Sequence, residues 1–121
     1  MEIAMHIIFA LGFSLLLIHE MDAIRCKEWN MFTGLKTMKE ESAFRFFLVL
    51  HLPLYVLAIT LLISRIQIVG FYLVDVFLVL HVVLHLLFKR NTANNFRNLS
   101  HAIIYLSGVC GAIHLVYLLI S

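Results

Sequence analysis

The sequence has little of the chemistry that stabilises small secreted domains. It contains only two cysteines, of which Cys26 lies in a charged segment and Cys110 in an apolar one. These settings differ so much that no structural disulfide is expected, and the chain has no CxxC motif. Charged residues make up only 13% of the chain, whereas hydrophobic residues make up 63% and the mean hydropathy is +1.00. A chain of this composition cannot hide its apolar surface from water by itself, which predicts a lipid environment.

Positive charge is also absent from the N-terminus. The first residues carry Glu2, and the first apolar run is followed, not preceded, by Arg25 and Lys27. A secretory signal has its positive charge on the opposite side of the apolar run. We therefore expect no cleavable signal peptide, and we interpret the first apolar run as a membrane helix.

Four segments are long and apolar enough to span a bilayer, which takes roughly 20 residues in a helix. Backbone groups in hydrocarbon must be hydrogen-bonded within the segment, and the alternating pattern of a membrane barrel is absent, so helices are expected. The sequence predicts an all-α, integral membrane four-helix bundle in a single transmembrane domain, 1–121. The predicted spans are 3–24, 43–64, 66–88 and 101–120.

Lysine and arginine are distributed unevenly among the connecting segments. Eight of the nine follow the first or the third span, whereas only Arg65 follows the second. By the positive-inside rule, the two basic segments face the cytosol and both termini lie on the non-cytosolic side. We predict a bacterial inner (cytoplasmic) membrane as the location, with membrane lipids as partners. No nucleic-acid partner is expected, and a homo-oligomer is left open.

Polar side chains inside the predicted spans are numerous, although each costs about 2.5 kcal/mol or more at the centre of a bilayer. When the four predicted helices are placed across the membrane, most of the histidines lie in its cytosolic third, and two carboxylates lie at the same depth. The histidines of this group are His19, His51, His81, His85 and His101, and the carboxylates are Glu20 and Asp22. Such a group predicts a site for an ion or a cofactor.

The fourth span has a stripe of residues spaced by four and three, which consists of His101, Tyr105, Gly108 and Ala112. Small residues on such a stripe indicate close helix contact, which predicts that His101 faces the interior of the bundle. By the same arithmetic, His114 is expected to face elsewhere.

A metal site is our first hypothesis. His81 and His85 are four residues apart, so they share a helix face and can put two imidazoles on one ion. Zinc is expected first, with iron or manganese as alternatives. The other predicted ligands are His19, His51 and His101, and the predicted catalytic carboxylates are Glu20 and Asp22, acting on a metal-bound water or orienting a ligand. The chain would then be a metal-dependent hydrolase or oxidoreductase acting on a lipid-like substrate, although the pattern leaves open whether it is an enzyme.

Three alternatives stay open. Haem b could bind between two histidines on facing helices, which leaves Glu20 and Asp22 without a role. Proton- or metal-ion-coupled transport would use Asp75 near the midplane, with His114 and His6 continuing the path outward. A structural network is the third alternative, because hydrogen bonds between helices are worth about 0.6–2 kcal/mol each. We assign His6 and His114 to this last class or to the outer interface.

The run His19-Glu20-Met21-Asp22-Ala23, followed by Lys27-Glu28-Trp29, resembles a set of uncharacterised small bacterial four-helix membrane proteins with an HExDA motif. The resemblance extends to His81-Val82-Val83-Leu84-His85 and Asn94-Asn95-Phe96. More loosely, the chain is similar to HXXEE-domain membrane proteins, whose motif has two adjacent acids. Its spaced histidines and acids also resemble the zinc site of alkaline ceramidases, an analogy of chemistry because those proteins have seven spans. The first resemblance implies a polytopic membrane protein without an established activity.

Overall fold

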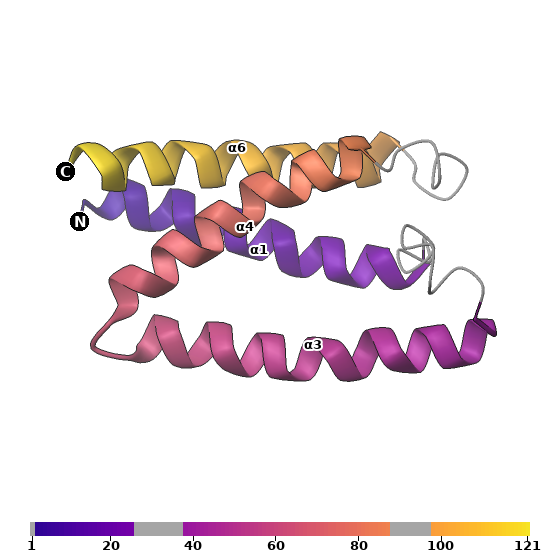
Figure 1. The fold of residues 1–121 in the computed structure, drawn as a ribbon. Helices are drawn as coiled ribbons and strands as arrows, with labels where there is room; N and C mark the ends of the chain where they lie inside the picture. The colour runs from indigo at the N-terminus through magenta and orange to yellow at the C-terminus, as the bar shows by residue number, and fades with distance from the viewer. Residues whose placement is uncertain (1, 26–37, 88–97) are drawn as a thin grey trace.

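The structure, a computed structural model, describes residues 2–25, 38–87 and 98–121. This part of the chain contains four α-helices and no strand (Figure 1). The ends of the predicted spans differ from the helix ends by a few residues, as is usual at helix termini. The all-α prediction is confirmed. The helices are α1 (Ile3–Arg25), α3 (Glu40–Ile63), α4 (Gln67–Leu87) and α6 (Asn98–Ile120).

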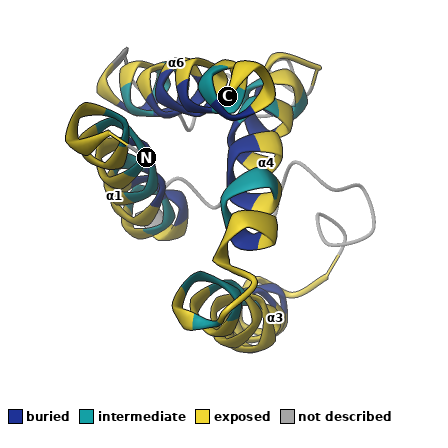
Figure 2. Cartoon of the chain, turned by 90° about the vertical axis from the view of Figure 1, so that its left-hand side faces the viewer, coloured by how far each residue is buried: buried dark blue, intermediate teal, exposed yellow. Residues whose placement is uncertain are grey.

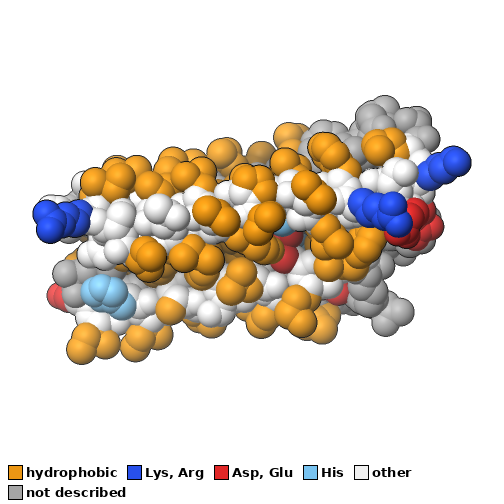
Figure 3. All heavy atoms as spheres, turned by 90° about the horizontal axis from the view of Figure 1, so that it is seen from below, with side chains coloured by type: hydrophobic (Ala, Val, Ile, Leu, Met, Phe, Trp, Pro, Cys, Tyr) orange, Lys and Arg blue, Asp and Glu red, His pale blue; other side chains and the backbone are white. Residues whose placement is uncertain are grey.

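Each of the four helices is long and apolar enough to cross a membrane. Figure 3 shows hydrophobic side chains over the middle of one face and lysine or arginine side chains near both of its ends. The two termini lie at the same end of the molecule (Figure 1), where the backbone N–H of Glu2 donates to the Tyr117 hydroxyl at 3.4 Å. This agrees with an even number of crossings. That this end faces away from the cytosol stays a prediction.

Helices α1, α4 and α6 pack against one another, and their buried faces turn inward in Figure 2. On α6 most of the buried positions follow one another in alternating steps of four and three residues. This spacing averages 3.6 residues, the repeat of the α-helix, and therefore keeps one seam facing the neighbouring helices. The seam consists of Ser100, Ile104, Ser107, Gly111, His114 and Leu118.

The buried seam corrects the predicted facing of α6. Gly108 is buried as expected, but Ala112 is exposed and His101 is only partly buried, whereas His114 is fully buried. The predicted stripe has the same alternating steps of four and three residues as the seam, but it is displaced by one residue along the chain, which turns it about 100° around the helix. It therefore has the periodicity of the contact face without coinciding with it.

Gly111 lies at a close contact between α4 and α6. A Cβ atom at this position would lie 2.8 Å from Leu78 Cβ and 3.2 Å from the Asp75 carbonyl oxygen. Glycine at such a contact lets two helix backbones come together. The contact holds α4 in the position that presents its histidines to α1.

We expect Gly111→Leu to lower the free energy of unfolding by about 3 kcal/mol, because the added side chain forces the two helices apart. Ala112→Leu, on the exposed side of the same helix, should change it by less than about 0.5 kcal/mol. The measurement is an SDS titration of the protein in mixed micelles, followed by circular dichroism. Equal losses in the two variants would contradict this account of the contact.

Helix α3 lies apart from the other three along most of its length (Figure 2). Only 6% of its spanning segment is buried, against 33% for α4 and α6. Near its start, Ala43 and Phe47 pack against Ala23 of α1. Near its end, Leu61 meets Gly70 of α4, where a Cβ would lie 3.1 Å from the Leu61 carbonyl carbon. Between these two contacts, α3 leaves space beside α1 and α4, and the candidate site borders that space.

Candidate metal centre

His81 and His85 lie one turn apart on the buried face of α4. Their imidazole rings stack with 4.7 Å between centroids, and the two Nε2 atoms are 2.9 Å apart. The side chains are thus aimed at a common point, as the four-residue spacing predicted. Both residues are nearly inaccessible, with 8% and 4% of their surfaces exposed.

His19 of α1 completes a group of three. Its ring meets the rings of His81 and His85 edge-on, with centroid distances of 4.6 and 5.0 Å, and only 1% of its surface is exposed. One potential ligand atom from each of the three residues lies within 4.8 Å of the other two. Neutral imidazole is the commonest protein ligand for divalent transition metals. These three buried histidines, hereafter the histidine trio, could therefore hold a metal ion.

Glu20, the residue after His19, points to a different partner. Its Oε2 atom lies 2.8 Å from Nε2 of His51 on α3. On the other side of the ring, His51 Nδ1 donates to the Phe47 carbonyl at 2.6 Å. With Nδ1 turned to that carbonyl, Nε2 is the ring nitrogen that faces the Glu20 carboxyl group, so a carboxyl group and an imidazole lie side by side. The pair is therefore equipped to accept or release a proton.

The trio and the Glu20–His51 pair border one apolar cleft. This cleft, of about 440 Å³, is lined by His81, by Glu20 and His51, and otherwise by leucine, valine and phenylalanine side chains of α3 and α4. A groove of about 350 Å³ between α1 and α3 also reaches Glu20 and His51. Figure 3 views the molecule from the α3 side and shows acidic atoms between rows of hydrophobic side chains. A ligand would thus meet one trio histidine and the Glu20–His51 pair in the same apolar space.

The remaining predicted site residues lie outside the trio. His51 belongs to the pair with Glu20. His101 is partly buried and stacks on Tyr105, with ring centroids 5.9 Å apart. Asp22 is also partly buried. Of the five histidines that share one predicted depth, the structure brings three to a common point.

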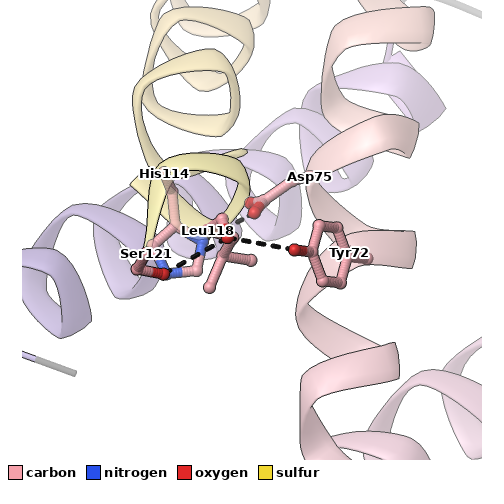
Figure 4. Close-up of polar contacts among 5 residues, drawn as sticks. All are labelled: Tyr72, Asp75, His114, Leu118 and Ser121. Carbon is pink, nitrogen blue, oxygen red and sulfur yellow. Dashed lines mark hydrogen bonds and ion pairs between the residues drawn. The ribbon is translucent and has the colours of Figure 1, made fainter. Parts of the chain in front are cut away.

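A second buried polar pair was missed as a unit by sequence reasoning. His114 Nδ1 of α6 lies 2.6 Å from Oδ2 of Asp75 on α4, and neither residue has accessible surface (Figure 4). Close by, the Tyr72 hydroxyl donates to the Leu118 carbonyl at 3.1 Å. The contact confirms that His114 hydrogen-bonds across helices, one of the roles assigned to it. The small residues Ser107 and Gly111, which share a seam with His114, are a sequence signal for this contact, but they do not distinguish the seam from the stripe through Gly108.

His6, the seventh histidine, is exposed near the N-terminus, and its Nδ1 donates to the Glu2 carbonyl at 3.1 Å. It belongs neither to the trio nor to the Asp75 pair, as expected. This position makes it a suitable control for experiments on the buried histidines.

Four helices of spanning length, two of which bring together three buried histidines that could hold a metal ion, are compatible with a polytopic membrane protein. The chain belongs to a family of unknown function, DUF6713, whose model matches residues 5–121. No curated protein and no solved structure matches it. Membership of an uncharacterised family is thereby confirmed, whereas the HExDA motif and the likeness to HXXEE-domain proteins stay predictions.

Proposed function

We propose that the histidine trio binds a divalent metal ion, zinc first and iron or manganese next, in a membrane hydrolase that acts on a lipid-like substrate. One observation carries the proposal: the buried trio borders, through His81, the apolar cleft that also holds Glu20 and His51. The bacterial inner membrane remains the proposed location, with the trio near its cytosolic face and membrane lipids as partners.

The geometry of the trio supports a tetrahedral ion. Zinc–nitrogen bonds of about 2.0–2.1 Å at tetrahedral angles put ligand atoms about 3.3 Å apart. The Nε2 atoms of His81 and His85 are 2.9 Å apart, and the ligand atoms of all three residues lie within 4.8 Å of one another. Three protein ligands leave a fourth position for water, as in catalytic rather than structural zinc sites. A bound ion would polarise a carbonyl oxygen or acidify that water.

The Glu20–His51 pair suits the proton transfers of hydrolysis. When water cleaves an ester, its oxygen bonds to the carbonyl carbon, the bond to the leaving oxygen breaks, and one proton passes from the water to the leaving group. We propose that Glu20 accepts that proton and that His51, oriented by the Phe47 carbonyl, donates one to the leaving group. We therefore narrow the proposed ligands to three and give His51 a catalytic role, while His101 and Asp22 receive none.

The geometry of the histidine trio favours a single metal ion over haem. Bis-histidine haem needs two imidazoles on opposite faces of a planar ring system. The trio rings instead pack directly on one another, with centroids 4.6–5.0 Å apart. No space for a porphyrin lies between them.

Elemental analysis of detergent-purified protein, after incubation with zinc and removal of the excess, tests the metal proposal. We expect about one ion per chain in the wild type, because the three imidazoles converge on one point. We expect loss of the ion in the triple variant His19→Ala, His81→Ala, His85→Ala. The matched variant His101→Ala should retain the ion, and the absorption spectrum should show no haem band. A wild type without metal, or a triple variant that keeps it, would overturn the proposal.

Transport is the second candidate, and the Asp75–His114 pair favours it. Asp75 lies on the same buried face of α4 as His81 and His85, so polar groups occur at two depths of one helix. Proton flux into liposomes that is lost in Asp75→Asn would support transport. Flux that is unchanged in this variant would exclude a relay through this pair.

A further inference from the structure

A separate apolar cavity continues from the Glu20–His51 pair toward the α3–α4 turn. Its volume is about 160 Å³, and it is lined by side chains of α1, α3 and α4, of which Leu57 and Leu73 are 56% and 53% exposed, so it is open on one side. One end is formed by Glu20 and His51, and the other by Leu61 and Gly70. His51 and Leu61 are ten residues apart, so the cavity extends about 15 Å along the helix.

The composition and size of the lining suit a hydrocarbon chain. Apart from Glu20, His51 and Tyr55, every lining residue is aliphatic, aromatic or glycine. An engineered apolar cavity of about 150 Å³ is large enough to bind benzene. A volume of this size that is drawn out over about 15 Å fits one alkyl chain and excludes a bulky polar headgroup.

The cavity is reached from the lipid side. The groove between α1 and α3 reaches the same two polar residues, and its rim includes Met21 and Leu52, which are 74% and 67% exposed. An alkyl chain can therefore enter the cavity from the bilayer without passing through water. Its polar end would stop at Glu20 and His51, the polar pair that the groove and the cavity share.

We propose that this cavity binds one alkyl chain of a substrate whose ester or amide group lies at Glu20 and His51. The identity of the reacting group rests on the proposed function, whereas chain binding does not. A neutral group is inferred because a free carboxylate would bring an additional charge without a partner into an apolar space, which is costly. The substrate class is thus a neutral single-chain or acyl-linked lipid.

Photolabelling in phosphatidylcholine nanodiscs tests chain binding directly. The probe is methyl hexadecanoate with a diazirine in the middle of its chain, and labelled peptides are mapped by mass spectrometry. In the wild type we expect saturable labelling of buried cavity-lining positions, such as Leu16 and Val74, that unlabelled methyl hexadecanoate displaces and hexadecanoate displaces poorly. Ala58→Phe, which fills the cavity, should lower the saturable labelling about tenfold. Ala112→Phe, on the exposed side of α6, should leave it unchanged.

Several outcomes would overturn the inference. These are labelling spread over all lipid-facing helix surfaces without saturation, equal labelling in the two phenylalanine variants, and displacement by the free acid as effective as by the ester. Leu57→Ala provides a second variant if Ala58→Phe does not fold, and its larger cavity should favour a probe with a branched chain.

The test also separates this inference from the metal proposal. Labelling should persist in His85→Ala, because His85 does not line the cavity. Absence of metal in a protein that labels saturably would contradict only the metal proposal. Absence of saturable labelling in a protein that binds metal would contradict only the chain site.

Discussion

Asp75→Leu is expected to lower the free energy of unfolding by about 3–5 kcal/mol, because it removes the carboxylate that faces His114 in a completely buried pair. The imidazole would remain between α4 and α6 with its Nδ1 atom deprived of that partner. The phenyl rings of Phe9 and Phe71, with centroids 5.0 and 5.6 Å from the His114 ring, offer no replacement acceptor.

The double variant Asp75→Leu, His114→Leu should recover most of this loss, to within about 1–2 kcal/mol of the wild type, because apolar groups of similar volume pack well where both partners are removed. Unfolding by SDS in mixed micelles provides the four free energies of the cycle. A double variant as unstable as Asp75→Leu would show that the carboxylate acts on something other than His114.

An exposed ion pair supplies the control for this cycle. Glu41 and Arg45 on α3 are 3.0 Å apart, but their side chains are 69% and 75% exposed. Glu41→Ala should therefore cost no more than about 0.5 kcal/mol. Both pairs are close contacts between groups that can carry opposite charge. The difference between the two losses in unfolding free energy therefore measures the effect of burial.

Zinc is expected to raise the unfolding free energy of the metal-free protein, since the trio converges only in the folded state. At a free zinc concentration about a thousandfold above the dissociation constant, the gain is about 4 kcal/mol. His85→Ala should abolish this gain. The measurement is the SDS unfolding transition with and without added zinc, after treatment with a chelator.

His6→Ala is the matched control, because His6 is exposed and lies outside the trio. This variant should keep the full zinc-dependent stabilisation. The same gain in wild type and His85→Ala would show that zinc acts at the surface of the protein and would contradict the trio as its site.

The sequence indicated a common level for the histidines along their helices, but not which of them lie close together. Depth follows from counting along each helix at 1.5 Å per residue, so His19, His81 and His85 could be placed near one level from sequence. Which of the histidines at this level meet one another depends on the rotation of each helix about its axis. His51 and His101 share the predicted level, but His51 turns to Glu20 and His101 stacks on Tyr105.

The sequence also does not determine which face of α6 contacts the neighbouring helices. Small residues are present on several of its faces, so a stripe through Gly108 and Ala112 and a seam through Ser107 and Gly111 are both consistent with close contact. Only the positions of α1 and α4 select the seam that buries His114. The pair with Asp75 could not be predicted, because 39 residues and a helix reversal separate its members.

Helix α3 could not be placed from its composition either. Its apolar surface would be satisfied equally by lipid or by other helices, since lipid tails are as apolar as leucine. Two local contacts, Ala43 with Ala23 and Leu61 with Gly70, hold it against α1 and α4. The cleft and the cavity exist because the middle of the helix does not close onto its neighbours.

The sequence by itself determined four apolar helices of spanning length, and it determined that histidines and carboxylates gather at one predicted depth. These features follow from local hydrophobicity and from the rise of a helix, which need no knowledge of neighbouring segments. The tertiary structure alone decided that three histidines converge, that Glu20 faces His51, and that His114 reaches Asp75. These contacts depend on helix rotation and crossing, which the packing of side chains such as Leu78 against Gly111 sets.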